Sequence, residues 1–113
     1  MTYEMKLNEN AFLNIKNGVK KFELRLFDER RKDITIGDTI IFHNLNNLDD
    51  TISVKVIALL RYPSFESLFE DIDYRLCGTA NNLKEKLERV HTFYSVDQEM
   101  KYGVLAIKID LIK

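Results

Sequence analysis

Hydrophobic and polar positions along the chain change their spacing several times, and the first spacing is that of a helix. Apolar residues recur every three to four positions between about Glu9 and Asn17, which predicts a helix there, capped by Asn8 or Asn10. Its buried face is expected to consist of Ala11, Phe12 and Ile15. Gly18 follows and is expected to end this helix in a left-handed conformation.

The spacing then changes to two, which predicts strands. Phe22, Leu24 and Leu26 alternate with polar residues from Lys21 onward, as in a half-buried strand. The charged run 27–33 reads as a loop, and 34–42 as a tight turn at Gly37-Asp38 that leads into a second strand. Polar residues 44–50 predict a hairpin-like loop, and 51–57 alternate again as a third strand.

The second half of the chain returns to helical spacing before a final strand. Pro63 is expected to end the preceding strand and Ser64 to cap a helix. The helical pattern is expected to break at Gly78. The next helix is expected to bury Leu83, Leu87 and Val90 and to leave Lys84, Glu85, Lys86, Glu88 and Arg89 in solvent. Ser95 and Gln98 fit a capping box, and 102–109 is an apolar strand typical of the centre of a sheet. This order of elements predicts an α+β fold, a small mixed β-barrel with antiparallel pairing and flanking helices.

Composition narrows the classes of protein to consider. With 113 residues, 45% hydrophobic and 31% charged, the chain is expected to form one soluble globular domain spanning 1–113. It has no long apolar run and no signal-peptide pattern, so we expect a cytoplasmic protein without a membrane anchor. A single cysteine, Cys77, and two separated histidines give no disulfide and no spaced set of metal ligands, so Cys77 is expected to be a packing residue.

Charge is unevenly distributed along the chain. The net charge is −1, yet residues 1–33 carry eight Lys or Arg against six Asp or Glu. This local excess suits a small anionic or polar ligand, or a short single-stranded segment, better than a nucleic-acid duplex.

The densest chemistry lies in Ile15–Arg25, where Lys20, Glu23 and Arg25 fall within six residues. Such a segment can also be an ordinary strand with a solvated charged face. Strict alternation places Glu23 and Arg25 on one face of the strand and Lys20 on the other. A shared cleft therefore requires the backbone to turn or bulge near Lys20, which the preceding Gly18 allows.

Three blocks of sequence resemble the ASCH domain family. They are Phe12-x-x-Ile15-x-x-Gly18-x-Lys20-x-x-Glu23-x-Arg25, then Ile36-Gly37-Asp38-x-Ile40-x-Phe42, then Tyr94-Ser95-x-x-Gln98-Glu99-x-x-Tyr102-Gly103-Val104. Gly-x-Lys-x-x-Glu-x-Arg is that family's signature element. The resemblance implies a PUA-like fold whose cleft receives RNA or a modified nucleoside. We expect no cofactor, and the residue content indicates no metal site.

The resemblance also implies candidate catalytic residues. Some small bacterial members are amidohydrolases that deacetylate N4-acetylcytidine, and their catalytic lysine corresponds to Lys20. Their second catalytic position is threonine, where this chain has Glu23. A further family glutamate falls near Thr79, with Asp71 and Asp73 the nearest carboxylates upstream. Other members are described as ribonucleases, although paired histidines of the usual kind are absent here.

Three readings of the site follow, and the residues leave them open; the third, ribonuclease action, has only the family resemblance in its favour. In the first, the cleft binds RNA or a nucleoside; in the second, Lys20 and Glu23 hydrolyse an N4-acylated cytidine or a related amide, with Glu23 as a general base. The expected ligand-binding residues are Lys21, Arg25, Arg31, Tyr94, Ser95 and Glu99. For the last three, a helix cap and ordinary packing are equally good interpretations, and Arg31 is a phosphate contact or an exposed loop cation. The sequence leaves the oligomeric state unspecified.

Overall fold

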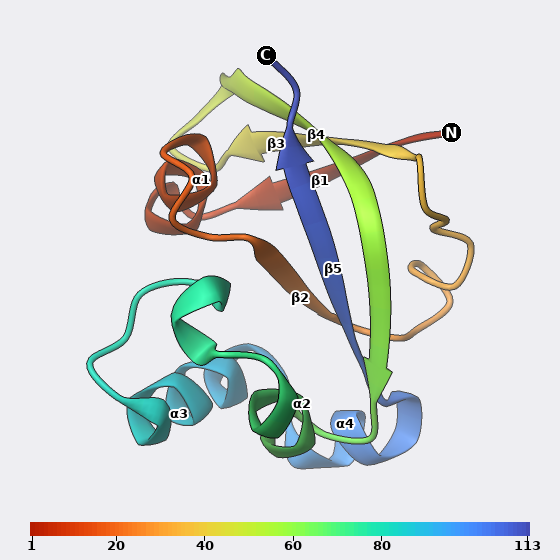
Figure 1. The fold of residues 1–113 in the computed structure, drawn as a ribbon, viewed down its shortest axis with the longest axis vertical. Coiled ribbons are helices and arrows are strands. Elements are labelled where there is room, and N and C mark those ends of the chain that lie inside the picture. The colour runs from red at the N-terminus through yellow and green to blue at the C-terminus, as the bar shows by residue number, and fades with distance from the viewer.

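The computed structural model describes residues 1–113 and shows an α+β arrangement (Figure 1). The strands are β1 (Thr2–Leu7), β2 (Phe22–Leu26), β3 (Thr39–Asn44), β4 (Asn47–Tyr62) and β5 (Val104–Leu111). The helices are α1 (Glu9–Lys16), α2 (Phe65–Asp71), α3 (Leu83–Phe93) and α4 (Val96–Tyr102), with a 3₁₀ turn, η1, at Tyr74–Cys77. No helix is long and apolar enough to cross a membrane.

The five strands form one sheet in the order β1-β3-β4-β5-β2, curled into a half-barrel. All neighbours pair antiparallel except β1 and β3, which are parallel. Figure 1 shows α1 beside one end of the curled sheet, while α2, α3 and α4 gather at the opposite end. Strand β2 runs between these two helical regions, so side chains on it can face both.

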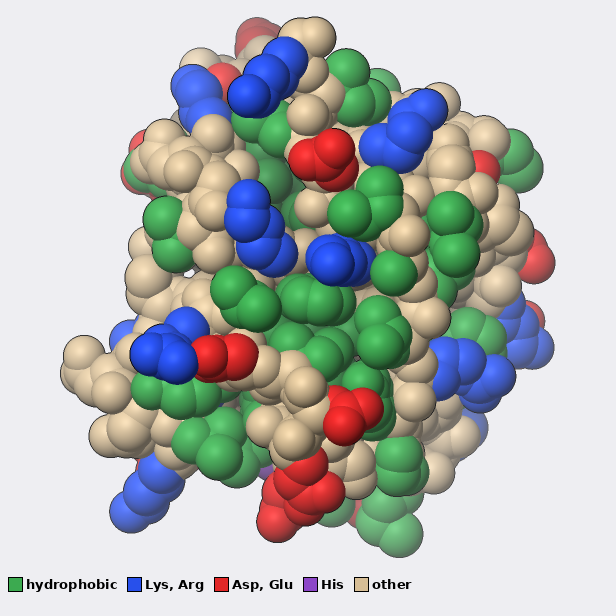
Figure 2. Space-filling view, in the orientation of Figure 1, with side chains coloured by type: hydrophobic (Ala, Val, Ile, Leu, Met, Phe, Trp, Pro, Cys, Tyr) green, Lys and Arg blue, Asp and Glu red, His purple; other side chains and the backbone are tan.

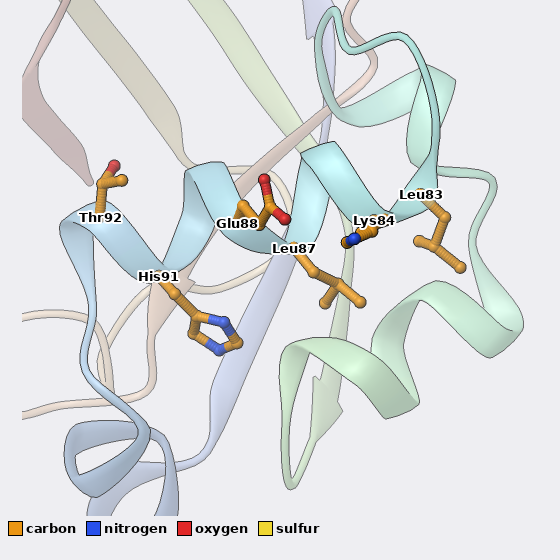
Figure 3. A pocket seen from close by; sticks show the side chains of 6 residues that line it. All are labelled: Leu83, Lys84, Leu87, Glu88, His91 and Thr92. Atoms are coloured by element: carbon orange, nitrogen blue, oxygen red, sulfur yellow. The ribbon is translucent and has the colours of Figure 1, made fainter.

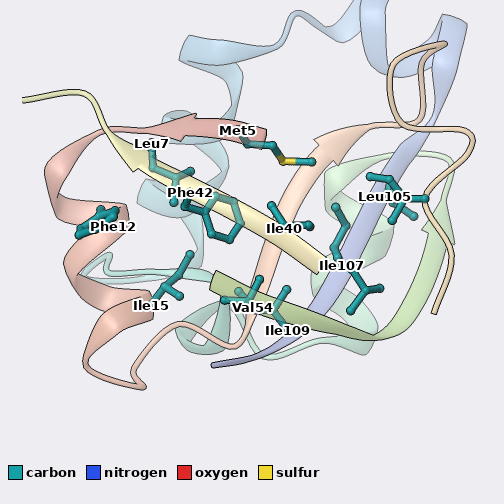
Figure 4. Close-up of a cluster of buried hydrophobic side chains, with 12 residues drawn as sticks. Met5, Leu7, Phe12, Ile15, Ile40, Phe42, Val54, Leu105, Ile107 and Ile109 are labelled. Carbon is teal, nitrogen blue, oxygen red and sulfur yellow. The ribbon is translucent and has the colours of Figure 1, made fainter. Parts of the chain in front are cut away.

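Two hydrophobic clusters hold the helices to the sheet. One, shown in Figure 4, packs α1 against the half-barrel through Phe12 and Ile15, which meet residues of β1, β3, β4 and β5. The other packs α2 and α3 against β2 and β5. Strand β5 contributes Leu105, Ile107 and Ile109 to the first cluster, and Val104 and Ala106 to the second. Burial on both faces explains why this strand is a continuous apolar run, as predicted for a central strand.

Several local predictions are confirmed. Helix α1 begins after Asn8, whose side chain accepts the Ala11 N–H at 2.9 Å. Gly18, just past its end, has φ +77°, the left-handed conformation that a residue with a Cβ resists. Ser64 caps α2, and Ser95 forms the predicted capping box of α4 with Gln98.

Three expectations about the elements are wrong. The first element is the strand β1, which the sequence analysis missed although Met5 and Leu7 alternate with polar residues. The polar stretch 44–50 is mostly strand: the turn is confined to residues 45–46, and β4 begins at Asn47. Its polar residues belong to an exposed arm of the hairpin, so their polarity does not mark a loop. In α3, Val90 is buried as expected, but Lys86, expected in solvent, is buried as well, and Leu83, expected to be buried, is exposed.

Candidate functional site

The loop between α1 and β2 turns Lys20 back toward the strand. After Gly18, the N–H groups of Val19 and Lys20 both donate to the Asn14 carbonyl, each at 2.9 Å, so the chain wraps around the end of α1. Lys21 then donates its N–H to the Leu76 carbonyl of η1 at 2.7 Å. Lys20 therefore lies before β2, which begins at Phe22, and escapes the alternation that would have separated it from Glu23.

Glu23 lies at the centre of a buried ion cluster. Its Oε1 contacts Lys20 Nζ at 2.7 Å, and its Oε2 contacts Arg25 through Nη2 at 2.7 Å and through Nε at 2.8 Å. Glu23 is only 3% exposed and Lys20 only 9%. Arg25 also reaches the Lys6 carbonyl of β1 at 3.3 Å, which ties the cluster to another strand. Both oxygens of the carboxylate are thus occupied by cations.

These contacts decide the ionisation of Glu23. Burial alone would raise the pKa of this carboxyl, but the charges and hydrogen bonds of Lys20 and Arg25 outweigh it and lower the pKa to about 2. Glu23 is therefore an anion across the physiological pH range. A general base works best with a pKa near the operating pH, so this carboxylate is a poor proton acceptor and a good fixed hydrogen-bond acceptor.

Helix α3 brings further cations to the same place. Lys86 is 9% exposed, and its Nζ donates to the Cys77 carbonyl at 2.9 Å. Arg89, one turn later, donates to the Thr79 carbonyl and pairs with Glu85 at 2.6 Å. Thr79 itself accepts a hydrogen bond from the Asn10 amide of α1 at 3.1 Å. The segment 77–79 is in this way held between α3 and α1.

A cavity of about 370 Å³ lies between these elements. That volume is at the lower end of the range for small-molecule sites, roughly 300–1,000 Å³. Its charged lining consists of five cations and one carboxylate: Lys6, Lys20, Arg25, Lys86, Arg89 and Glu23. Phe93 and Tyr94, at the end of α3, add two aromatic rings. A positively charged, partly apolar pocket of this size can hold a planar polar ligand.

The predicted site residues are only partly brought together. Lys20, Glu23, Arg25 and Tyr94 line the cavity. Burial raises the pKa of the Tyr94 hydroxyl, although the positive charge of Arg25 opposes the rise. The Tyr94 ring stacks on Phe65 at 5.8 Å between centroids. Tyr94 thus serves packing and the cavity wall at once.

The other predicted ligand contacts lie outside the lining. Lys21 is exposed, and Ser95 caps α4. Glu99 is buried between α2 and α3, where it accepts the Phe65 N–H at 2.8 Å and contacts His91 Nε2 at 2.7 Å. Arg31 is half-buried; burial and the charge of Arg25 lower its guanidinium pKa, and its Nε has no hydrogen-bond partner.

The implied third catalytic group is not matched by a carboxylate in the cavity. Thr79 lines it, but Asp71 accepts the Tyr62 hydroxyl at 2.9 Å, and Asp73 pairs with Arg75 at 2.7 Å. Neither aspartate belongs to the lining.

Sequence reasoning missed Lys86, Arg89 and Phe93. All three lie on one face of α3 with Val90, at spacings of three and four. The predicted buried face of this helix consists of Leu83, Leu87 and Val90, and Leu83 is 41% exposed. The signal was present in the sequence, since Lys86 and Val90 are one turn apart, but a lysine is ordinarily assigned to solvent.

A second hollow follows the outer face of α3. Figure 3 shows its lining, which is Leu83, Lys84, Leu87, Glu88, His91 and Thr92. All six residues come from one helix, so the hollow is an open groove that cannot enclose a ligand. On the face seen in Figure 2, acidic and basic side chains are interspersed, so that face has no continuous basic surface for a duplex.

Comparison with known proteins agrees with this architecture. The chain matches the ASCH domain family over residues 5–113. No protein with a curated description matches it. Among solved structures, the crystal structure of hypothetical protein PH0355 is 36% identical, with a TM-score of 0.88 over 99% of this chain and 100% of that one. The solution structure of protein PF0455 from Pyrococcus furiosus is 33% identical, with a TM-score of 0.81 over 100% and 99%.

A more distant structure carries the family's name. The ASCH domain from Lactobacillus crispatus JV V101 is 10% identical, with a TM-score of 0.68 over 97% of this chain and 79% of that one. At this identity the likeness concerns the fold alone, which confirms the predicted α+β, PUA-like architecture. With the family match across almost the whole sequence, the conclusion is that this chain belongs to the ASCH domain family.

Proposed function

We propose that this ASCH domain binds a nucleoside unit of RNA, free or within a single strand, in the cavity lined by Lys20, Glu23 and Arg25. ASCH domains form a PUA-like family thought to bind RNA, which supports the class of ligand. The observation that carries the proposal is the buried Glu23 carboxylate, fixed by two cations in the wall of a cavity of about 370 Å³.

The ion cluster suits recognition of a base. Bases present both donors and acceptors along their edges, and single-stranded RNA is read through those edges together with stacking on aromatic or guanidinium planes. Glu23 supplies an acceptor with a fixed charge, and Lys20 and Arg25 supply donors. Phe93, 67% exposed at the rim, supplies a ring on which a base can stack.

Amide hydrolysis is the alternative, and the arrangement favours it less. A lysine can act as nucleophile or base only when its Nζ is free to reach the substrate, yet the Glu23 carboxylate holds Lys20 Nζ at 2.7 Å. Glu23 in turn is held as an anion by its two partners. Hydrolysis in this site therefore requires the ligand to break the ion pair first.

The test is a measurement of equilibrium binding by isothermal titration calorimetry. The panel consists of the four ribonucleosides, N4-acetylcytidine and a short single-stranded RNA, and each mixture is also chromatographed for released cytidine. Saturable binding of at least one nucleoside or of the RNA is expected. No binding by well-folded protein would overturn the proposal, and release of cytidine by wild type but not by Lys20→Ala would establish the hydrolase.

A variant at the rim separates this cavity from other surfaces. Phe93→Ala removes an exposed ring, and loss of one base–aromatic stack weakens binding by about 1–3 kcal/mol, roughly 5- to 150-fold. Leu83→Ala is the matched control, because Leu83 lies on the same helix but lines the outer groove. Equal affinities of the two variants would place the ligand elsewhere.

A further inference from the structure

Lys86 is a buried cation without an ionic partner. It is 9% exposed, and no carboxylate pairs with it: Glu23, which lines the same cavity, already binds Lys20 and Arg25. Its single hydrogen bond goes to the neutral Cys77 carbonyl at 2.9 Å, although an ammonium group has three donors. Buried charges in proteins are ordinarily paired, so an unpaired one in a cavity wall calls for a partner from outside.

The groups around Lys86 include two further cations, which increases the need for an anionic partner. The charged and titratable groups facing it are Lys20 beside β2, Glu23 on β2, Cys77 on η1 and Arg89 on α3. Burial, followed by the positive charge of Lys20, lowers the Lys86 pKa to about 8. The whole cavity has five cationic side chains and one carboxylate, in a protein whose net charge is −1.

Gly78, next to the Lys86 ammonium group, has no side chain that would crowd it. Gly78 adopts φ +129°, a conformation that favours glycine, and a Cβ built on it would lie 3.1 Å from Lys86 Nζ. A side chain at this position would crowd the ammonium group. The missing Cβ therefore leaves room for Lys86 Nζ, which the Cys77 carbonyl holds, and Lys86 lines the cavity.

We propose that the ligand of this cavity carries an anionic oxygen group, phosphate or carboxylate, that pairs with Lys86. This inference rests on the proposed function and deepens it: the preferred ligand is a nucleotide, or a nucleoside whose base bears a carboxylate, and the uncharged nucleoside is a weaker ligand. Phosphate and carboxylate share the chemistry that Lys86 requires, which is a charge-assisted hydrogen bond from an ammonium.

Three sets of ligands distinguish the sources of the anion. Ribonucleosides, their 5′- and 3′-monophosphates, and a uridine carrying a carboxymethyl group on the base are titrated into wild type, Lys86→Met and Lys86→Gln. An anionic ligand is expected to bind wild type about 10- to 150-fold more tightly than Lys86→Met, from the roughly 1.5–3 kcal/mol of a hydrogen bond to a charged group. The uncharged parent nucleoside is expected to bind both within about threefold.

A matched control and a proton count sharpen the test. Lys84→Met removes an exposed lysine from the opposite face of the same helix and should behave as wild type. Pairing with an anion raises the Lys86 pKa, so binding near pH 8.5 should take up a proton in wild type, seen as a dependence of the calorimetric heat on buffer ionisation, and none in Lys86→Met. A lysine with only a structural role would not change the number of protons taken up on binding.

The outcomes separate the two proposals. Equal affinity of wild type for charged and uncharged ligands, or equal losses for both in Lys86→Met, overturns the role of Lys86 and leaves nucleoside binding intact. The remaining case is an anion site in a protein that binds no nucleoside. Titration with inorganic phosphate and with acetate tests it, observed by NMR through the Lys86 Cε resonance. If these anions shift the resonance while no nucleoside or nucleotide binds, the proposed function fails and the anion site stands; if nothing shifts it and nothing binds, both fail.

Discussion

The substitution Glu23→Gln tests the ion cluster on which the site depends. It keeps the size of the side chain, removes its charge, and leaves the buried Lys20 and the half-buried Arg25 without an anion. Removing one partner of a buried ion pair typically costs about 3–5 kcal/mol. The folded state holds the Glu23 pKa at about 2, against an ordinary value of 4.5, and this difference corresponds to roughly 3 kcal/mol of stability at neutral pH.

The dependence on pH has a definite sign. A carboxyl whose pKa is lower in the folded than in the unfolded state stabilises the fold above pH 4.5, and this contribution is lost as the pH falls through 4.5 toward 2. Urea denaturation followed by circular dichroism should therefore find Glu23→Gln about 3 kcal/mol less stable than wild type at pH 7. The gap should shrink to roughly 1.5 kcal/mol at pH 3, because wild type loses much of the same interaction by protonation.

Glu70→Gln is the matched control for this measurement. Glu70 is exposed on α2 and forms no ion pair, so its substitution should change the free energy of unfolding by less than about 0.5 kcal/mol at every pH. A gap below about 1 kcal/mol for Glu23→Gln at pH 7, or one that stays constant down to pH 3, would refute the argument that Lys20 and Arg25 stabilise the Glu23 anion.

Two further predictions concern buried groups near the cavity. The folded state lowers the Lys86 pKa from 10.5 to about 8, so between pH 8 and pH 10.5 the unfolded chain binds more protons than the folded one. Thermal unfolding should therefore show wild type gaining stability relative to Lys86→Met as the pH rises from 8 to 10.5. Stability curves of the two proteins that run parallel over this pH range would contradict the prediction. Burial raises the Cys77 pKa to about 11, so native protein should react with iodoacetamide at pH 8 far more slowly than urea-unfolded protein, as mass spectrometry can follow; equal rates would show an accessible thiol.

Local sequence patterns were sufficient for much of the fold. The spacing of Phe12 and Ile15, the cap at Asn8 and the stop at Gly18 predict α1 within a residue of its observed end. The central place of β5 also follows from its unbroken apolar run, since burial on two faces removes alternation. The parallel pairing of β1 with β3 did not follow, because it depends on the return of the chain through α1 and β2, which no local pattern encodes.

The candidate site was only half visible in the sequence, for a physical reason. Lys20, Glu23 and Arg25 are neighbours in the chain, so a local motif brings them together. Lys86 and Arg89 come from a helix more than sixty residues later, and they reach the same cavity through tertiary packing. A lysine on a helix is ordinarily assigned to the solvent-exposed face, so its burial could not be predicted from the pattern. Such exceptions are expected at functional sites, where a ligand requires a charge that folding alone would leave in solvent.

The balance of charge in the cavity connects these observations. The two oxygens of Glu23 are satisfied by Lys20 and Arg25 before any ligand arrives, so the carboxylate contributes a rigid acceptor and no spare proton affinity. Lys86 is the reverse, a donor that folding leaves two-thirds unused. A cavity whose anion is already paired with two cations, and whose buried Lys86 has unused donors, is better arranged to hold a charged ligand than to transfer its protons. A hydrolytic mechanism that uses Lys20 Nζ must first break its 2.7 Å contact with Glu23, so in the hydrolase interpretation ligand binding precedes chemistry.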